Sequence, residues 1–263
     1  MRIEILVIGN EILIGKCQDT NSNWMAKRIA KYGHILSRIT TIGDIEDDIA
    51  ETIQSILHRE PDIIITSGGL GPTFDDITMQ SVAKGLNRKL TIDKHAYRLI
   101  KKGYEKAYDK GLLKLREMTK EREKMAYLPT NSTMLPNLVG AAPGVKIKEG
   151  NSIIYILPGV PTELKKMFRE FIIPYLSKKK GKFLEKGFII RDIGESQLAP
   201  FITSLEEKNP KLWIKTHPRT QYGVELELSI TAFNLENASD TVDSILDEVR
   251  AIVASLGGKV IEK

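Results

Sequence analysis

The residues best suited to chemistry in this chain lie in one short stretch, residues 62–78. It begins with an apolar, β-branched run at residues 62–66, which predicts a buried strand. The loop residues that follow are Ser67, Gly68, Gly69, Leu70 and Gly71. Glycine accepts positive φ angles and lets the backbone approach a ligand closely. Because a helical pattern comes next, unpaired N–H groups should converge here, and the stretch predicts a phosphate-type anion site.

Two adjacent carboxylates, Asp75 and Asp76, follow the glycine loop just after Thr73. They would repel a bound anion unless a cation lay between the charges. We therefore expect a divalent metal (Mg²⁺, Mn²⁺ or Co²⁺) held by Asp75 and Asp76, with Asp44 and Glu11 as further candidates. The structural alternatives are that Asp76 and Asp44 only cap the helices that follow them, and that Glu11 is a solvated loop residue.

A site of this kind suits the cleavage of a diphosphate, in which positioning and charge neutralisation supply most of the catalysis. The metal would activate a water molecule and bridge the diphosphate oxygens. Asp75 and Asp76 are the candidate catalytic residues. The glycine loop and Thr73 are candidate ligand-binding residues.

The first part of the chain alternates strand-like and helix-like segments. Strands are expected at residues 2–8, 35–42 and 62–66, with helices between and after them. Alternation with short loops predicts a mostly parallel sheet with helices on both faces, a three-layer α/β fold. Ligands bind beyond the carboxyl ends of the strands in such sheets. Gly9, Glu11 and Asp44 follow the first two strands, so we expect them close to the glycine loop.

A second strand–turn–helix edge follows the apolar residues 152–157. Pro158 and Gly159 form the turn, and Thr162 or Glu163 either caps the next helix or faces the ligand. We expect Pro158, Gly159 and Thr162 to form the wall opposite the glycine loop. Asn21 lies in a cluster of helix-capping residues and either caps its own helix or contacts the sugar or phosphate of a ligand.

Two other segments shape the expected architecture. Residues 90–124 are polar and helical, an excursion over the surface that suits a lid or an oligomer contact.

The basic residues 178–182 suggest a linker, so we expect one domain at residues 1–177 and a small α+β domain at residues 178–263. In the second domain we expect strands at residues 187–193, 211–216 and 223–233 and helices at residues 195–208 and 237–256.

The composition excludes several classes of protein. With 41% apolar and 28% charged residues, the chain is typical of a globular protein. It has no apolar run long enough to cross a bilayer, and its first residues resemble a strand, so we expect a cytoplasmic protein with no membrane partner. The net charge of +5 is spread among interleaved acids, which argues against nucleic acid as a partner. The single Cys17 excludes an intramolecular disulfide and a cysteine-rich zinc site.

Six segments together carry a family resemblance. They are residues 9–15, 19–21, 40–44, 66–78, 137–144 and 157–164, and the fourth contains Gly68-Gly69-Leu70-Gly71-Pro72-Thr73-Phe74-Asp75-Asp76. In this order, over about the first 170 residues, they resemble the CinA family of competence- and damage-inducible proteins. The region is also similar to the wider molybdopterin-binding (MoaB/Mog-type) superfamily, whose members bind or adenylylate molybdopterin. Residues 187–256 resemble the KH-like domain of longer CinA proteins.

The resemblance implies a metal-dependent hydrolase of a nucleotide diphosphate, an ADP-ribose pyrophosphatase. Two alternatives stay open on the same fold: a non-catalytic binder of a nucleotide or pterin phosphate, and transfer of an adenylyl group to molybdopterin. The nicotinamide mononucleotide deamidase domain of many CinA proteins is not expected, because the chain stops at Lys263. The resemblance also implies a homo-oligomer. The second domain lacks the Gly-x-x-Gly loop of RNA-binding KH modules, so we expect it to mediate interaction or dimerisation.

Overall fold

The computed structural model describes residues 1–219 and 225–262. The chain divides into two compact units, residues 1–30 with 34–179 and residues 31–33 with 180–263. All of the residues predicted to form the site, from Gly9 to Thr162, belong to the first unit. In the described part of the chain, no helix combines the length and the apolar character needed to cross a membrane.

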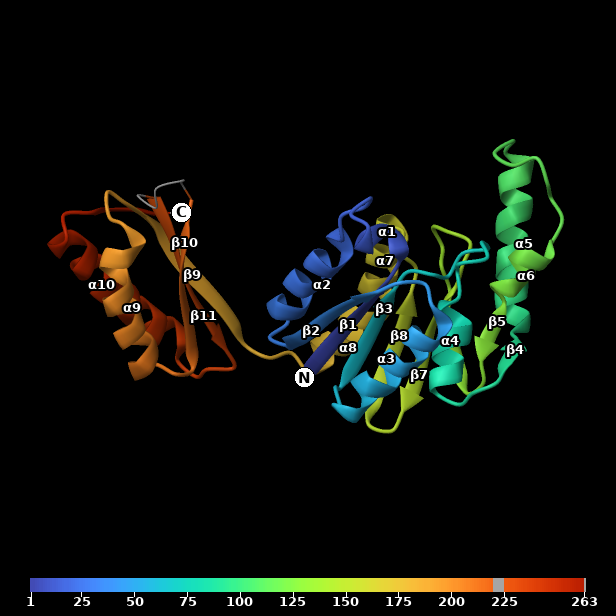
Figure 1. The fold of residues 1–263 in the computed structure, drawn as a ribbon, viewed down its shortest axis with the longest axis horizontal. Coiled ribbons are helices and arrows are strands. Elements are labelled where there is room, and N and C mark those ends of the chain that lie inside the picture. The colour runs from blue at the N-terminus through green and yellow to red at the C-terminus, as the bar shows by residue number, and fades with distance from the viewer. Residues whose placement is uncertain (220–224, 263) are drawn as a thin grey trace. The chain divides into compact units, whose positions relative to one another are not determined.

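The first unit is built on a six-stranded sheet in the order β2-β1-β3-β8-β7-β6 (Figure 1). Its strands are β1 (Arg2–Ile8), β2 (Ile35–Ile42), β3 (Ile63–Ser67), β6 (Ser132–Leu135), β7 (Gly144–Glu149) and β8 (Ser152–Leu157). Strands β2, β1, β3 and β8 are parallel, β7 pairs antiparallel with β8, and the edge strand β6 pairs antiparallel with β7. The expected mostly parallel sheet is therefore confirmed. Its central strand, β3, is buried along its whole length, as a strand covered on both faces must be.

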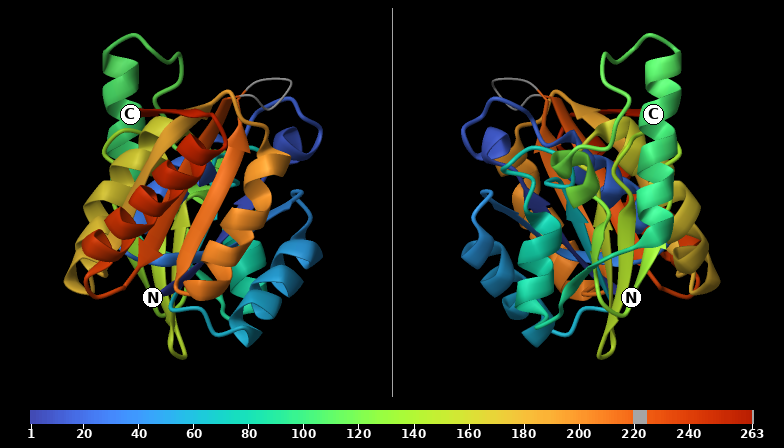
Figure 2. Two further views of the ribbon diagram at one scale, coloured as in Figure 1. Left: turned by 90° about the vertical axis from the view of Figure 1, so that its left-hand side faces the viewer. Right: turned by 90° about the vertical axis from the view of Figure 1, so that its right-hand side faces the viewer.

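Helices cover both faces of this sheet (Figure 2). They are α1 (Asn10–Leu13), α2 (Thr20–Lys31), α3 (Glu46–His58), α4 (Thr78–Gly85), α7 (Pro161–Met167), the π-helical turn η1 (Phe168–Ile172) and α8 (Ile173–Lys178). The isoleucines of α3 and Val82 of α4 pack with Leu6 and Ile64 in one core cluster. On the other face, α2 meets η1 where Trp24 and Phe168 pack edge to face, 5.3 Å apart. The three-layer prediction is confirmed.

Residues 90–124 are not helical throughout. Strand β4 (Leu90–Ile92) pairs with β5 (Tyr127–Pro129), and between them lie α5 (Lys94–Asp109) and α6 (Lys120–Lys124). The prediction of a wholly helical excursion was wrong at its start, because a three-residue strand is too short to show a period of two. Ala96 and Ile100 anchor α5 in the core, and most of its other side chains are exposed.

The second unit is a small α+β structure, as expected. Its antiparallel sheet has the order β10-β11-β9-β12. Its elements are β9 (Phe183–Arg191), α9 (Glu195–Lys208), β10 (Leu212–Pro218), β11 (Glu225–Phe233), α10 (Ala238–Ser255) and β12 (Lys259–Glu262). The edge strand β12 was not predicted, and residues 223–224 of the predicted third strand lie outside the described residues. Apolar residues of both helices pack on the sheet in a separate core.

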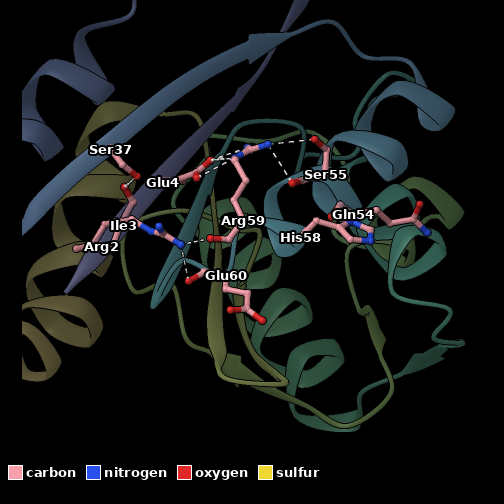
Figure 3. Close-up of polar contacts among 9 residues, drawn as sticks. All are labelled: Arg2, Ile3, Glu4, Ser37, Gln54, Ser55, His58, Arg59 and Glu60. Atoms are coloured by element: carbon pink, nitrogen blue, oxygen red, sulfur yellow. Dashed lines mark hydrogen bonds and ion pairs between the residues drawn. The ribbon is translucent and has the colours of Figure 1, made fainter.

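A buried ion pair ties the first strand to the end of α3 (Figure 3). The Glu4 side chain is 3% exposed, and its Oε2 lies 2.6 Å from Nη2 of Arg59, which is 29% exposed. Arg59 also donates to the backbone oxygen and the hydroxyl of Ser55, and Arg2 donates to the backbone oxygens of Arg59 and Glu60. The Glu4 carboxylate raises the pKa of Arg59 further through its hydrogen bond. The pair therefore holds α3 to β1 at the amino end of the strands.

We predict that Arg59→Ala lowers the free energy of unfolding by about 3 kcal/mol, because it leaves the buried Glu4 carboxylate without a partner. The double variant Glu4→Leu/Arg59→Leu should lose much less, since no charge is then stranded. Urea unfolding followed by circular dichroism measures both. Equal losses in the two variants would contradict the assignment of the effect to the stranded charge.

Candidate functional site

The glycine loop is tied to three neighbouring segments directly after β3. The N–H of Gly68 donates to the backbone oxygen of Leu157 at 3.2 Å, and the Thr78 hydroxyl donates to the oxygen of Gly68 at 2.9 Å. Gly68 has a φ of +111°, and a Cβ there would lie 2.1 Å from the backbone oxygen of Ile8. Only glycine fits between β1 and β8 at this position.

The next three residues leave their N–H groups free. Gly69 takes a φ of +67°. Among residues 1–219 and 225–262, no acceptor is found for the N–H groups of Gly69, Leu70 and Gly71. Successive free N–H groups beside a left-handed residue form an anion-binding concavity. The loop therefore has the geometry that the sequence predicted for phosphate binding.

These residues line a cavity of about 470 Å³ at the carboxyl edge of the sheet. The predicted residues in its wall are Glu11, Gly68, Gly69, Leu70, Gly71, Asp76, Pro158 and Gly159. The wall also contains Glu163, which the sequence left as an alternative to Thr162, and five residues that were not predicted: Pro72, Met125, Ala141, Ala142 and Val160. The site therefore combines a polar glycine loop with an apolar patch from α6, the 141–142 loop and the turn before α7.

Asp75 and Asp76 gather around one hydroxyl group. The Thr73 Oγ lies 2.5 Å from Asp75 Oδ1 and 2.6 Å from Asp76 Oδ2, and Asp76 Oδ2 also accepts the N–H of Thr73 at 2.9 Å. A hydroxyl has a single hydrogen and can donate to only one carboxylate at a time. The hydrogen bond from Thr73 lowers the pKa of Asp75 and so favours its charged form. Asp76 does not cap α4, which has no side-chain cap.

Asp44 tethers the start of α1. Its Oδ2 accepts the N–H of Asn10 at 2.8 Å, and it does not cap α3. Burial raises the pKa of Asp44, and the nearby charges of Glu11, Asp75 and Asp76 raise it further. The charges of the carboxylates predicted from two other loops thus act on Asp44.

The donor set fits a hard divalent cation, because carboxylate oxygens are the ligands that Mg²⁺ and Mn²⁺ prefer. In the part of the chain with described coordinates, however, no three His, Cys, Asp or Glu side chains are arranged to hold a metal. An ion here would need oxygens from the ligand as well, as is usual for Mg²⁺ bound with phosphates. Binding of a metal at Asp44, Asp75 and Asp76 stays a prediction.

Asn21 joins the end of β3 to the turn at Gly159. Its Nδ2 donates to the backbone oxygen of Gly159 at 2.7 Å and to the hydroxyl of Ser67 at 3.3 Å. Asn21 is buried, and its Oδ1 has no hydrogen-bond partner among the described atoms. The contacts place Asn21 as a support that holds the turn at Gly159 against the end of β3.

Seven predicted residues are absent from the cavity wall: Gly9, Asn21, Asp44, Ser67, Thr73, Asp75 and Thr162. Thr162 is exposed and absent from the wall, Asp75 lies outside it beside Thr73, and Gly9 precedes α1, where a Cβ would meet the Glu11 carboxylate. In the turn after β8 it is Glu163 that faces the cavity. The sequence left Thr162 and Glu163 as alternatives, because only the start of the helix decides which one turns inward.

Asn137 is the residue that holds Glu163, and its role was not predicted. Its Nδ2 donates to Glu163 Oε2 at 2.6 Å and to the backbone oxygen of Ala142 at 3.0 Å. Its Oδ1 accepts the N–H groups of Val139 and Gly140. Burial raises the pKa of Glu163, and the hydrogen bond from Asn137 opposes that effect. The signal in the sequence was a polar residue at the start of the motif at residues 137–144.

We predict that Asn137→Ala lowers the free energy of unfolding by about 2–4 kcal/mol, because it removes the partners of two backbone N–H groups, a backbone oxygen and Glu163. Asn131→Ala, at an exposed position in the turn before β6, is the control and should cost less. Thermal unfolding measures both. Equal effects would mean that Asn137 does not organise the loop.

Comparison with known proteins gives a consistent match. Residues 4–178 match the family described as "probable molybdopterin binding domain". A protein from Metallosphaera sedula is 36% identical over 260 residues, covering 97% of this chain and 95% of its own, and a Pyrococcus furiosus protein is 41% identical over 217 residues, covering 82% and 84%. The crystal structure of CinA from Thermoplasma acidophilum, described as having unknown function, is 32% identical. It covers 66% of this chain and 96% of its own, with a TM-score of 0.60.

Proposed function

The chain belongs to the family of probable molybdopterin binding domains, and we propose that its cavity binds the phosphate of a pterin or nucleotide. The sequence resemblance to this superfamily is confirmed over residues 4–178, and the resemblance to CinA is confirmed by the Thermoplasma acidophilum structure. The KH-like character of residues 187–256 and the homo-oligomer stay predictions.

The observation that carries the proposal is the row of free N–H groups at Gly69, Leu70 and Gly71 in the cavity wall. We infer that these groups hold phosphate oxygens without any positively charged side chain, because free backbone N–H groups carry a partial positive charge. The apolar patch that includes Met125 and Val160 suits the flat ring of a pterin or a nucleobase. A volume of about 470 Å³ lies within the usual range for small-molecule sites.

We predict that Gly69→Ala weakens the binding of AMP and of a pterin phosphate by about tenfold or more, because the new Cβ would lie 2.2 Å from the Thr78 hydroxyl and displace the loop. Gly150→Ala is the matched control. It also has a positive φ, +54°, but its Cβ would meet nothing within 4 Å, and it lies in the turn between β7 and β8. Calorimetric titration measures both.

The binding proposal is contradicted if the unmodified protein binds neither probe, or if both alanine variants bind as it does. A loss of affinity shared equally by Gly150→Ala would point to backbone strain and not to the loop.

A second candidate function is hydrolysis of a diphosphate such as that of ADP-ribose. The observation that favours it is the pair of charged carboxylates around the Thr73 hydroxyl, beside the cavity. Asp75 and Asp76, with Asp44 and Glu11 near them, would hold a divalent ion together with phosphate oxygens. When bound, such an ion supplies charge neutralisation and an acidified water molecule. The chain itself contributes the N–H groups that orient the phosphate.

We predict that Asp75→Asn/Asp76→Asn lowers the metal-dependent release of AMP from ADP-ribose by about a hundredfold or more, because it removes both charges that hold the ion. The assay uses the purified chain with Mg²⁺, Mn²⁺ or Co²⁺ and separates the nucleotides by chromatography. Asp109→Asn, at an exposed position on α5 outside the cavity, is the control.

Hydrolysis is rejected if no AMP appears with any of the three metals, or if the double variant is as active as the unmodified protein. Consumption of ATP that depends on an added pterin would instead indicate adenylyl transfer. Binding of a ligand without its hydrolysis would support the binding proposal and reject the hydrolase proposal.

A further inference from the structure

A basic groove lies along α5, next to the cavity described above. It has a volume of about 760 Å³ and is lined by one side of α5, by Leu112 and Leu113, and by residues 137–141. We call it the α5 groove. Ala141 belongs to both walls, and otherwise the groove is separate from the glycine loop.

Four cations line the α5 groove at intervals of four residues: Arg98, Lys102, Lys106 and Lys110. No carboxylate lies in its wall. Within residues 1–219 and 225–262, none of the four cations forms an ion pair, and Asp109 on the same helix pairs with Arg116 instead. Like charges four residues apart destabilise an isolated helix. Repulsion among the four cations therefore destabilises the helix, and no ion pair within the described residues offsets that repulsion.

Gly103 lies in the middle of α5 and lines the same groove. Its φ is not positive, and a Cβ there would meet nothing within 4 Å. Glycine in the interior of an exposed helix is less favourable than almost any other residue. Packing within the unit does not require a glycine at this position, and its missing side chain leaves room for something outside the chain to approach the backbone closely.

Apolar side chains form the rest of the groove. Leu112 is 72% exposed, Leu138 is 69% exposed and Val139 is 55% exposed, and all three belong to its lining. Tyr104 also lines the groove, and the Arg122 guanidinium lies 3.9 Å from its ring centre. Large apolar side chains grouped at the surface beside unpaired cations are typical of a docking surface.

We propose that the α5 groove binds an acidic amphipathic helix of a partner protein. Helix α5 has 16 residues and is about 24 Å long, so its cations are spaced about 6 Å apart along the groove. Carboxylates at every fourth residue of a second helix have the same spacing. Apolar side chains on the same face of that helix contact Leu112, Leu138 and Val139, and the absence of a side chain at Gly103 lets its backbone come close.

The test starts from a random library of 16-residue peptides displayed on phage and selected on the immobilised full chain. Selected peptides are then synthesised, and their affinities are measured by fluorescence anisotropy beside scrambled versions of the same composition. We expect Asp or Glu at four-residue intervals with Leu, Ile, Phe or Met on the same face. Scrambling should weaken binding by about tenfold or more, because it breaks the match of spacing.

Charge variants locate the binding surface. Lys102→Glu/Lys106→Glu should weaken binding of the selected peptides by about tenfold or more. Lys101→Glu/Lys120→Glu makes the same change in net charge at two exposed positions outside the groove, and it should change the affinity by less than about twofold.

Gly103→Leu separates docking from folding. The new side chain enters open space, so the free protein should unfold at a temperature that is unchanged or about 2–4 °C higher. The same variant should weaken peptide binding by about tenfold or more, because the side chain occupies the groove.

Three results would overturn the proposal. The first is selection of no peptides, or of peptides without spaced acids. The second is equal binding of the peptides to Lys102→Glu/Lys106→Glu. The third is self-association in light scattering that Lys102→Glu/Lys106→Glu abolishes, which would assign the α5 groove to a second copy of this chain.

Discussion

The candidate site depends on how closely the backbone of Gly68 approaches β1 and β8. A Cβ at Gly68 would lie 2.1 Å from the oxygen of Ile8, and a Cβ at Gly159 would lie 3.2 Å from the Cα of Gly68. The Gly68 N–H is used by Leu157 and its oxygen by Thr78, whereas no acceptor among the described residues is found for the N–H groups of the next three residues. The candidate anion site therefore begins directly after the point of closest backbone packing.

Charge is distributed unevenly around this sheet. At the amino end of the strands, Glu4 is buried with its partner Arg59, and the pair is satisfied. At the carboxyl end, burial raises the pKa of Asp44, and the charges of Asp75 and Asp76 add to that effect. Groups whose pKa is shifted by burial and by neighbouring like charges often lie where a protein binds a ligand or catalyses a reaction. The contrast between the two ends of one sheet is consistent with a ligand that carries a cation to the carboxyl end.

The loop at residues 137–142 connects two surfaces with different properties. Asn137 holds it through four hydrogen bonds, one of them to Glu163. One side of the loop faces the cavity through Ala141 and Ala142, and the other side contributes Leu138 and Val139 to the α5 groove. The loop that Asn137 holds is therefore part of both surfaces.

The residues 62–78 were enough to predict a strand and a glycine loop with free N–H groups, because those properties depend on neighbouring residues. The carboxyl edge of a parallel sheet also brought Glu11, Asp44 and Gly159 to the right region, since strand direction alone sets which loops meet there. Only the tertiary structure showed which residues form the wall of the cavity opposite the glycine loop. Asn137 lies 26 residues before Glu163, and no local pattern shows that they bond. Glu163, and not Thr162, faces the cavity because the start of α7 sets which side chain points inward, and that start depends on how β8 packs beside β3.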